Sequence, residues 1–286
     1  MRPGANRLRR NAVSKEAAQI TKASRSNLAL AFVALPKQRR ADISVFYAFC
    51  RVIDDITDDP GHTRAERQAD LDLWKAAVES PHPAEPTLAP TVREIIARYG
   101  LSVADFREVI AGMEMDLEEA RYGTWEGLKL YCHRVASVVG LVSIGIFGAR
   151  DPRAKAYALS LGLALQLTNI LRDVGGDLAN EGRIYLPEED LARFGVSRED
   201  LAAGRRTEGF LALMDFEAER ARAYYREAQS LLPAADKKAL IAAEIMRAVY
   251  SRLLEKMSRD RWQVFDRRYS LGKLTKLWLV LRGILG

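Results

Sequence analysis

The stretch QLTNILRDVGGD, Gln166–Asp177, decides the fold because it joins helical spacing to an unusual polar face. Asn169, Asp173 and Asp177 recur every four residues, and a helix of 3.6 residues per turn places such positions along one side. The twin glycines Gly175-Gly176 are a helix-stop signal, so we expect the helix to end there. Negative charge near a helix C-terminus is unfavourable by roughly 0.3–1 kcal/mol. The pattern therefore indicates a compensating cation and a functional site.

A second acidic cluster, YAFCRVIDDITDDPG at residues 47–61, repeats this pattern earlier in the chain. Asp54 and Asp58 are again four residues apart, and Pro60-Gly61 ends the predicted helix. Two acidic helix ends that face each other across a cleft would share Mg²⁺, which prefers oxygen ligands and often binds substrate phosphates as well. The alternative for either cluster alone is a solvated acidic surface beside a turn. A third acidic group is interpreted as surface charge: Glu114, Asp116, Glu118 and Glu119.

The composition narrows the class of protein. The chain has 286 residues, 48% hydrophobic and 29% charged, which suits a globular protein with a large core. The net charge is +6, but the basic residues are scattered apart from an N-terminal group, which argues against nucleic-acid binding. Three histidines without ligand spacing argue against zinc. We find no secretory leader and no run of 18 apolar residues, and Cys50 and Cys132 lie in apolar patterns, so we expect reduced core thiols in a cytoplasmic protein.

Helical periodicity runs along the chain, without a repeat or strand alternation, so the fold class is all-α. Residues 1–23 are predicted to form a basic N-terminal arm that leads into a helix at 15–24, and residues 24–286 a single all-helical domain. Loops are expected at 80–90 and 179–190. The segment 128–148 is predicted to be a fully buried helix with a bend at Gly140. The remaining helices are expected from 39 into the first acidic cluster and at 63–79, 91–99, 102–116, 151–177, 208–231, 234–258 and 271–285.

Arginines adjoin both acidic clusters. Arg51 lies one turn before the first pair of aspartates, and Arg172 lies within the second cluster. Arginine binds phosphate oxygens bidentately, so with bridging metals these residues suit a diphosphate leaving group. Surface ion pairs with the neighbouring aspartates are the alternative. The carbocation left by ionisation needs a dry pocket, which the small apolar segment 135–147, Tyr131 and Phe32 would line.

These residues resemble the squalene/phytoene synthases, a family of trans-type head-to-head prenyltransferases, from about Ser24 to Tyr269. YAFCRVIDDITDD is similar to the first aspartate-rich motif of the family, and QLTNILRDVGGD followed by GRIYLP is similar to the second. YCHRVASVVG matches a further block, and LPKQRR and MRAVY resemble the flanking pattern. The resemblance implies a single large helical bundle of the isoprenoid synthase type with a central cleft. Asn27 and Leu28 depart from the usual serine and aromatic, and Gly176 replaces a common acid.

The resemblance also implies roles for individual residues. Magnesium, with manganese as a substitute, would be bound by Asp54, Asp58, Asn169 and Asp173, with Asp177 assisting. Diphosphates would be held by Arg51, Arg172, Tyr250 and Arg268, and by an N-terminal turn with Ser24, Ser26 and Asn27, whose alternative role is to cap a helix. The reacting centre would contain Tyr47, Tyr131 and Gln166 together with the catalytic aspartates Asp54, Asp58 and Asp173.

The reaction that the resemblance implies joins two copies of an allylic prenyl diphosphate through a cyclopropyl diphosphate, which is released or rearranged to a linear hydrocarbon. We expect the substrate to be farnesyl diphosphate, with a presqualene diphosphate or squalene-type C30 product. The alternative is a phytoene synthase that condenses two geranylgeranyl diphosphates. The sequence is silent on NADPH. More distant alternatives are a chain-elongating synthase or class I terpene cyclase, whose second motif usually differs, and a non-enzymatic helical scaffold that binds metal.

The C-terminal segment LGKLTKLWLVLRGILG, residues 271–286, is too short and too basic to span a bilayer. Its helical spacing predicts an apolar face with Leu271, Leu274, Trp278, Leu281 and Leu285. This face either packs on the core or makes peripheral contact with a membrane, where Lys273 and Lys276 would suit anionic headgroups.

Overall fold

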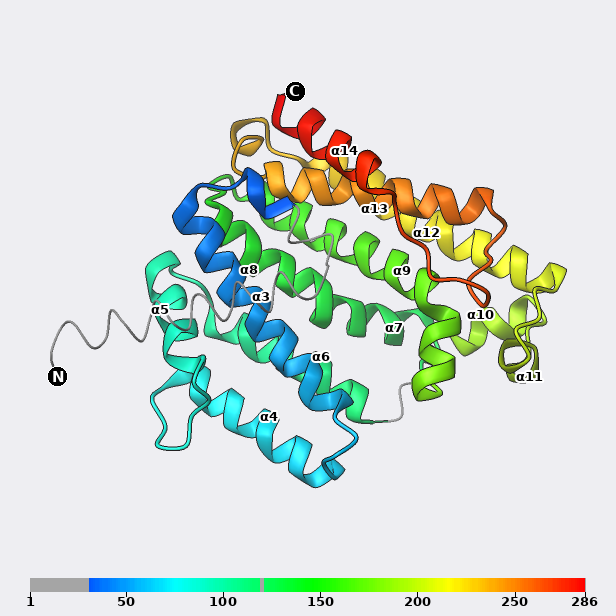
Figure 1. Cartoon of the computed structure of the whole chain (residues 1–286), viewed down its shortest axis with the longest axis horizontal. Coiled ribbons are helices and arrows are strands. Elements are labelled where there is room, and N and C mark those ends of the chain that lie inside the picture. The colour runs from blue at the N-terminus through cyan, green and yellow to red at the C-terminus, as the bar shows by residue number, and fades with distance from the viewer. Residues whose placement is uncertain (1–30, 119–120, 286) are drawn as a thin grey trace, which may run out of the picture.

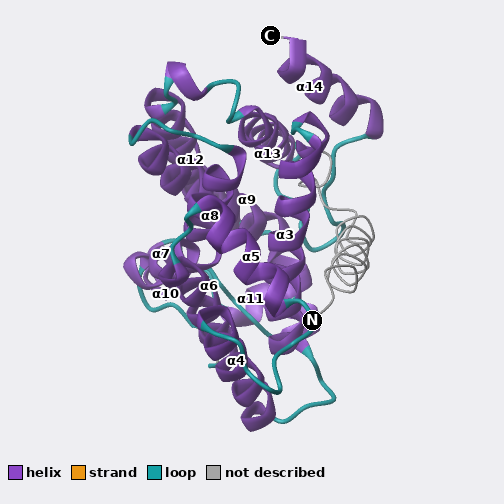
Figure 2. Cartoon of the chain, turned by 90° about the vertical axis from the view of Figure 1, so that its left-hand side faces the viewer, coloured by secondary structure: helices purple, strands orange, loops and turns teal. Residues whose placement is uncertain are grey.

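The computed structural model describes residues 31–118 and 121–285 of the chain, and these residues form helices joined by loops (Figures 1 and 2). In this part of the chain one isolated β-bridge pairs Arg121 with Ile184, and no named strand occurs. The all-α prediction is therefore confirmed. The predicted N-terminal arm at 1–23, the helix at 15–24 and the turn with Ser24, Ser26 and Asn27 lie outside the described residues.

The helices agree with most of the predicted ranges. The first half of the chain contains a 3₁₀ turn η1 Phe32–Ala34 and the helices α3 Lys37–Asp58, α4 Arg64–Glu79, α5 Ala89–Tyr99, α6 Val103–Leu117 and α7 Trp125–Cys132. A π-helical turn η2, His133–Ser137, joins α7 to α8 Val138–Phe147. The second half contains α9 Arg153–Glu181, α10 Glu188–Arg193, α11 Arg198–Ala202, α12 Glu208–Leu231, a 3₁₀ turn η3 Ala234–Asp236, α13 Ile241–Arg259 and α14 Lys273–Leu285.

The long helix α9 is the centre of the fold, as Figure 1 shows. Its 29 residues span roughly 43 Å at 1.5 Å per residue, and it packs against α8, α12, α13 and the π-helical turn. Leu167, Leu171 and Val174 are buried at helical spacing, which leaves the face with Asn169 and Asp173 for a cleft. Burying a leucine-sized side chain stabilises the fold by about 1.5–3 kcal/mol, so this row fixes the orientation of the polar face.

The helix stop predicted at Gly175-Gly176 is wrong, because α9 continues to Glu181 and ends at Gly182 in the left-handed conformation with φ 66°. Gly175 instead permits a close approach between two backbones. A Cβ atom there would lie 2.5 Å from the carbonyl oxygen of Val264 and 2.9 Å from the Cα of Phe265. The glycine is therefore a packing residue within the helix.

The bend predicted at Gly140 is also misplaced, since the helical register changes at the π-helical turn His133–Ser137. A Cβ atom on Gly162 of α9 would lie 2.5 Å from the Cα of Ser137, so this turn is pressed against α9. The prediction that 128–148 is fully buried is wrong as well. Val139 and Ser143 are only half-buried because they line a cavity.

Two loop boundaries differ from the prediction. The loop expected at 179–190 is shorter, because α9 extends to Glu181 and α10 begins at Glu188, where three acidic residues stabilise the first turn. The helix expected from 234 begins at Ile241. Before it, the buried carboxylate of Asp236 accepts hydrogen bonds from the backbone N–H groups of Arg150 and Asp151 at 2.8 and 2.7 Å, which holds this segment in a turn.

In the part of the chain that the structure describes, one segment, Trp125–Phe147, is long and apolar enough to cross a membrane by length and composition. The sequence analysis did not expect such a run. Of its most apolar window, 44% is buried inside the protein, and residues such as Val139 face an internal cavity. The core helix of a globular protein passes the same test, so this segment is weak support for a membrane span.

The C-terminal helix α14 packs on α13, with Leu279 and Val280 buried and Gly283 against Ile245. The predicted apolar face is partly buried and partly exposed in the structure. Leu271 is buried, whereas Leu274 is 83% exposed. Packing on the core is thus confirmed for one side of α14, and an apolar side remains in contact with solvent.

Candidate active site

A polar cavity of about 850 Å³ lies where α3 and α9 bring their acidic clusters together. It is lined by every predicted site residue within the described part of the chain: Tyr47, Arg51, Asp54, Asp58, Tyr131, Gln166, Asn169, Arg172, Asp173, Asp177, Tyr250 and Arg268. Further lining residues had no predicted role in this site: Asp116, Ile170, Arg183, Tyr185, Tyr269, Ser270 and Lys276. Residues separated by more than two hundred positions therefore meet in one site.

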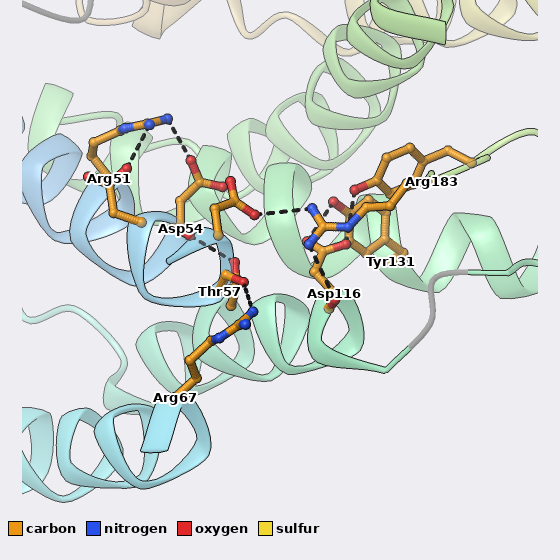
Figure 3. A network of polar contacts seen from close by, with 10 residues as sticks. Arg51, Asp54, Thr57, Arg67, Asp116, Tyr131 and Arg183 are labelled. Atoms are coloured by element: carbon orange, nitrogen blue, oxygen red, sulfur yellow. Dashed lines mark hydrogen bonds and ion pairs between the residues drawn. The ribbon is translucent and has the colours of Figure 1, made fainter. Parts of the chain in front are cut away.

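The first acidic cluster is held by arginines on both sides (Figure 3). Arg51 contacts the carboxylates of Asp54 and Asp55, each at 2.6 Å. From across the cavity, Arg183 reaches Asp58 at 3.2 Å. Asp54 and Asp58 line the cavity, whereas Asp55 does not. The positive charge of the arginines offsets the repulsion between the crowded carboxylates. The same contacts hold these side chains at the end of α3.

The second acidic cluster is centred on Asp173 and is less exposed. Arg172 donates from Nε to Asp173 at 2.9 Å and makes a second contact through its terminal nitrogen. Burial opposes the charge of Arg172, but hydrogen bonding and attraction by Asp173 outweigh this effect and raise the pKa of the guanidinium. Arg268 approaches the same carboxylate from a distant segment, with an Nε–Oδ1 distance of 3.1 Å. Its side chain is 76% exposed, against 12% for Arg172, so it is free to follow a ligand.

A strained turn places Arg268 over the cavity. Arg261 and Trp262 have φ values of 53° and 54°, the left-handed region that costs most residues about 1–2 kcal/mol. The buried Trp262 side chain donates from Nε1 to Asp215 at 2.8 Å, which offsets the strain. The chain then lies directly on Gly175, and this close packing brings Arg268 to the second acidic cluster.

Asp116 is the site residue that the sequence analysis misread, since it was interpreted as surface charge. Its carboxyl group is buried and accepts hydrogen bonds from the hydroxyls of Tyr131 and Tyr185, both at 3.0 Å. Burial raises the pKa of the Asp116 carboxyl to about 7, despite the opposing effects of Arg183 and the two phenols. The signal was present in the sequence: Asp116 continues the buried row of Val109 and Met113 on α6.

The surface interpretation holds for other members of the third acidic group. Glu114 pairs with Lys75 and accepts a hydrogen bond from Gln68 at 2.5 Å, away from the polar cavity. Glu118 is exposed and lies 4.0 Å from Arg64. Glu119 is outside the described residues. One acidic group of the sequence thus contains a buried site residue beside ordinary surface charges.

Arg183 and Tyr185 belong to the loop before α10, to which the sequence analysis gave no individual role. The loop is fastened by the bridge between Arg121 and Ile184 and by a 2.8 Å hydrogen bond from the N–H of Glu188 to the carbonyl of Tyr122. Below it, Arg220 of α12 binds the buried carboxylates of Asp190 and Glu217 at 3.1 and 2.6 Å. These contacts hold Arg183 and Tyr185 at the cavity wall.

An apolar cavity of about 210 Å³ continues from the polar one. The two cavities share Tyr47, Gln166, Asn169 and Tyr250. The rest of the apolar lining comes from η1, α3, α8, α9, α13 and the π-helical turn, and includes Phe32, Phe46, Val135, Val139, Ser143, Phe147, Tyr157, Leu161, Leu165 and Met246. The combined site suits an amphiphilic ligand with a charged head and a long apolar tail.

The oxygen-rich lining fits a divalent metal that is shared with a ligand. The side-chain oxygen of Asn169 is buried and lacks a hydrogen-bond partner in the described part of the chain, so it is an available ligand. Within the same residues, no three acidic, histidine or cysteine side chains are close enough to hold an ion alone. Magnesium usually takes one or two carboxylates and completes its shell with water and phosphate oxygens, which agrees with this arrangement.

The cysteines and histidines take no part in the polar cavity. Cys50 and Cys132 are free thiols; Cys132 is buried in the core as predicted, and burial raises the pKa of its thiol, whereas Cys50 is half-buried and lines the apolar cavity. His62 lies on the surface and contacts Asp59 at 2.6 Å. The polar lining of this site consists mainly of carboxylates, arginines and tyrosines, with the amides of Gln166 and Asn169.

An all-helical bundle with acidic, arginine-paired helix ends above an apolar pocket defines the class of prenyl diphosphate-using enzymes with the isoprenoid synthase fold. The chain belongs to the squalene/phytoene synthase family, whose model matches residues 21–275. The members of this family are prenyltransferases that join prenyl diphosphates head to head. The match confirms the resemblance seen in the sequence, and the all-helical structure confirms the predicted fold.

Relatives with curated names include phytoene synthases. The chain is 37% identical over 252 residues to "Phytoene synthase 1, chloroplastic" of Arabidopsis thaliana, covering 84% of this chain and 58% of that protein. It is 36% identical over 250 residues to the phytoene synthase of Arthrospira platensis, covering 82% and 80%. The chain thus spans less than two thirds of the plant protein and most of the other.

Solved structures with the same fold include a dehydrosqualene synthase in complex with ligand, at 27% identity and a TM-score of 0.83, with 96% of each chain covered. The squalene synthase HpnC from Alicyclobacillus acidocaldarius has 26% identity and a TM-score of 0.75, with 89% of this chain and 96% of that chain covered.

Proposed function

We propose that this protein is a phytoene synthase, which condenses two molecules of geranylgeranyl diphosphate. From the sequence alone, farnesyl diphosphate was the expected substrate and this reaction was the alternative. The comparison supports the alternative, because the phytoene synthases are 36–37% identical to this chain and the dehydrosqualene and squalene synthases only 26–27%. The observation that carries the class of reaction is the polar cavity opening into an apolar one.

In this proposal the arginines bind the diphosphate groups. Arg51, Arg172 and Arg268 are paired with aspartates in the structure, and each offers further N–H groups to phosphate oxygens. Tyr250 lies beside Arg172 at the junction of the two cavities, where it would hold the diphosphate next to the reacting carbon. Tight binding of the leaving group stabilises the negative charge that develops as the carbon–oxygen bond breaks.

Magnesium would be held by Asp54, Asp58, Asn169 and Asp173, with Asp177 assisting, all of which line the cavity. When bound, it would act as a Lewis acid that neutralises the leaving diphosphate. Asn169 and Gln166 lie at the junction of the cavities, so they would orient the first carbon of the substrate. Tyr47 and Tyr131 would face the carbocation with electron-rich rings, while the apolar walls exclude water.

The test is incubation of the purified full-length protein with Mg²⁺ and either geranylgeranyl or farnesyl diphosphate, with and without NADPH. We expect a C40 hydrocarbon from the C20 substrate without a reductant, and a kcat/KM at least about tenfold higher than for the C15 substrate. A C30 product formed in preference to C40 would restore the farnesyl interpretation. Inactivity with both substrates would contradict the proposed function.

We further propose that the exposed face of α14 contacts the surface of an anionic membrane, from which substrate enters and to which product returns. Among described residues, seven large apolar side chains are exposed, and five of these lie on α14: Leu274, Leu277, Trp278, Leu281 and Ile284. Lys273, Lys276 and Arg282 lie on the same helix, and Lys276 also lines the polar cavity. Membrane contact by α14 would place the mouth of the cavity beside the lipid.

Sedimentation with vesicles measures this contact. The triple substitution Leu274→Ser, Leu277→Ser and Leu281→Ser removes exposed apolar surface without touching Leu279 or Val280, so the fold should persist. We expect salt-sensitive binding of the wild-type protein to anionic vesicles and its loss in this variant, whereas Leu130→Ser, at a similarly exposed site on α7, should bind normally. Equal binding of all three proteins would rule out contact through α14. A cytoplasmic location with peripheral membrane contact is part of this proposal.

A further inference from the structure

The buried carboxyl group of Asp116 accepts hydrogen bonds from two phenol hydroxyls at the wall of the polar cavity. Tyr131 donates to Oδ2 and Tyr185 donates to Oδ1, and the two rings lie 5.2 Å apart and nearly parallel. All three residues line the cavity, and they come from α6, α7 and the loop before α10. Figure 3 shows Tyr131, Asp116 and Arg183 together opposite the acidic end of α3.

This arrangement decides which atoms the phenols present to a ligand. A tyrosine hydroxyl has one hydrogen, and both hydroxyl hydrogens are used on Asp116. The phenol oxygens, which also contact each other, therefore have lone pairs and not hydrogens left for a ligand. They suit a cation or an acidic C–H bond better than a diphosphate, which needs donors. Asp116 behind them is only 8% exposed, so its carboxyl group is shielded from bulk water.

The position of Arg183 supports the same interpretation. Its guanidinium contacts Asp58 at 3.2 Å and the main-chain carbonyl of Asp116 at 3.5 Å. Arg183 is thus directed at the acidic cluster and at the backbone, and the side-chain oxygens of Asp116 are left to the phenols. Burial has already raised the affinity of this carboxyl for a proton, with a pKa of about 7.

We propose that Asp116 is a positioning residue that lets Tyr131 remove the proton which ends the reaction. The inference rests on the proposed function, in which the last carbocation is not reduced. A C–H bond next to the cationic carbon breaks, and its electron pair forms the new double bond. The proton passes to the phenol oxygen of Tyr131, whose own hydrogen passes to Oδ2 of Asp116. The products are a neutral hydrocarbon and a protonated carboxyl group, so no reductant or oxidant is needed.

The substitution Asp116→Asn tests this because it keeps the size of the side chain. An amide donates a hydrogen bond through its nitrogen, so one phenol must turn its hydrogen toward the cavity, and no carboxylate remains to take the proton. Tyr131→Phe removes the phenol and leaves the carboxyl group. Tyr122→Phe is the matched control, since the ring of Tyr122 lies 5.4 Å from that of Tyr131, tilted by 39°, but its hydroxyl has no hydrogen-bond partner among the described residues.

The experiment incubates each full-length protein with Mg²⁺ and geranylgeranyl diphosphate, without NADPH, and measures pyrophosphate release and hydrocarbon separately. For Asp116→Asn and Tyr131→Phe we expect hydrocarbon per released pyrophosphate to fall by about 10²-fold, with cyclopropyl diphosphate or alcohols accumulating. Tyr122→Phe should keep the wild-type ratio.

Hydrocarbon and pyrophosphate that fall in parallel in both variants would overturn the inference, because they would show only a structural role for Asp116. The same conclusion follows if the wild-type ratio is retained in Asp116→Asn. If Asp116→Asn fails to fold, the ratio in Tyr131→Phe decides in the same way. A wild-type protein that yields no hydrocarbon, or yields it only with NADPH, would contradict the deprotonating reaction itself.

Discussion

The polar and apolar cavities meet at four residues, yet they are built in opposite ways. In the polar cavity, each acidic cluster is held by arginines, as in the contacts of Arg51 with Asp54 and of Arg172 with Asp173. In the apolar cavity, the walls are held by close backbone packing, as where Gly162 meets the π-helical turn. The first region depends on charge at fixed positions, whereas the second depends on volume.

This difference means that the two regions should respond differently to mutation. A change of one charge in the polar cavity alters the stabilisation of the leaving group, which acts at the transition state. A change of one methyl group in the apolar cavity alters the length of tail that fits, which affects the choice of substrate. We expect turnover to be controlled by the polar cavity and specificity by the apolar one.

The largest effect is expected from Asp54→Asn and Asp173→Asn, which keep side-chain size but remove a charged oxygen from the cavity. Turnover at saturating Mg²⁺ should fall by about 10²–10³-fold while the helical circular dichroism is unchanged. The control is Asp55→Asn, because Asp55 contacts Arg51 but does not line the cavity. If the Asp55 variant is impaired as strongly as the other two, charge alone and not position controls turnover.

A smaller loss is expected from Arg172→Lys. Lysine keeps the charge but loses the forked geometry that contacts Asp173, so kcat/KM should fall by about 10–30-fold, equivalent to roughly 1.4–2 kcal/mol. Arg222→Lys is the control, since Arg222 pairs with Glu255 at 2.8 Å outside the cavity lining, so the change should leave kcat/KM intact. Steady-state kinetics at several Mg²⁺ concentrations provide the measurement. An unchanged kcat/KM in Arg172→Lys would show that Arg172 only forms a structural ion pair with Asp173.

The apolar cavity is tested by Ser143→Phe, which adds volume on the face of α8 that lines it. The ratio of kcat/KM for C20 to that for C15 should fall by about tenfold, because the longer tail loses its space. Ser143→Ala should leave the ratio unchanged, since the serine hydroxyl is bonded to the carbonyl of Val139 at 2.7 Å. Competition between the two substrates reveals the ratio directly. If turnover fell with both substrates while the C20 to C15 ratio of kcat/KM stayed the same, this wall would not select the substrate by the length of its tail.

The smallest effects are expected from alanine substitutions of the twin glycines, which should behave differently from each other. Gly176 has no neighbouring atom within 4 Å of an added Cβ, so Gly176→Ala should stabilise the helix by about 0.5–1 kcal/mol without affecting activity. Gly175→Ala would press on Val264 and should weaken activity several-fold by displacing Arg268 from Asp173. Thermal unfolding and kcat/KM of the two variants check this pair. Identical behaviour of both variants would show that the contact at Gly175 does not position Arg268.

The sequence by itself determined the helices and the two acidic clusters, because spacing along a helix is a local property. Asn169, Asp173 and Asp177 lie on one face for any helix of 3.6 residues per turn. The arginines beside them could be recognised for the same reason. Every site residue predicted outside the N-terminal segment therefore lines the cavity, although Arg183 and Tyr185 of the GRIYLP motif line it too and had no predicted role.

Only the tertiary structure decided which distant residues join these motifs. The pattern predicted a helix stop at Gly175, but its purpose depends on Val264, which contacts it from another part of the chain. Asp116 reads as one acid among several until Tyr131 and Tyr185 are seen to donate to it. The spacing on α6 indicates that Asp116 lies on the buried face, but the choice of its partners arises from packing between segments far apart in sequence, which no local spacing encodes. That is why the charged motifs and Tyr131 could be predicted, whereas the hydrogen bonds that join Tyr131 and Tyr185 to Asp116 could not.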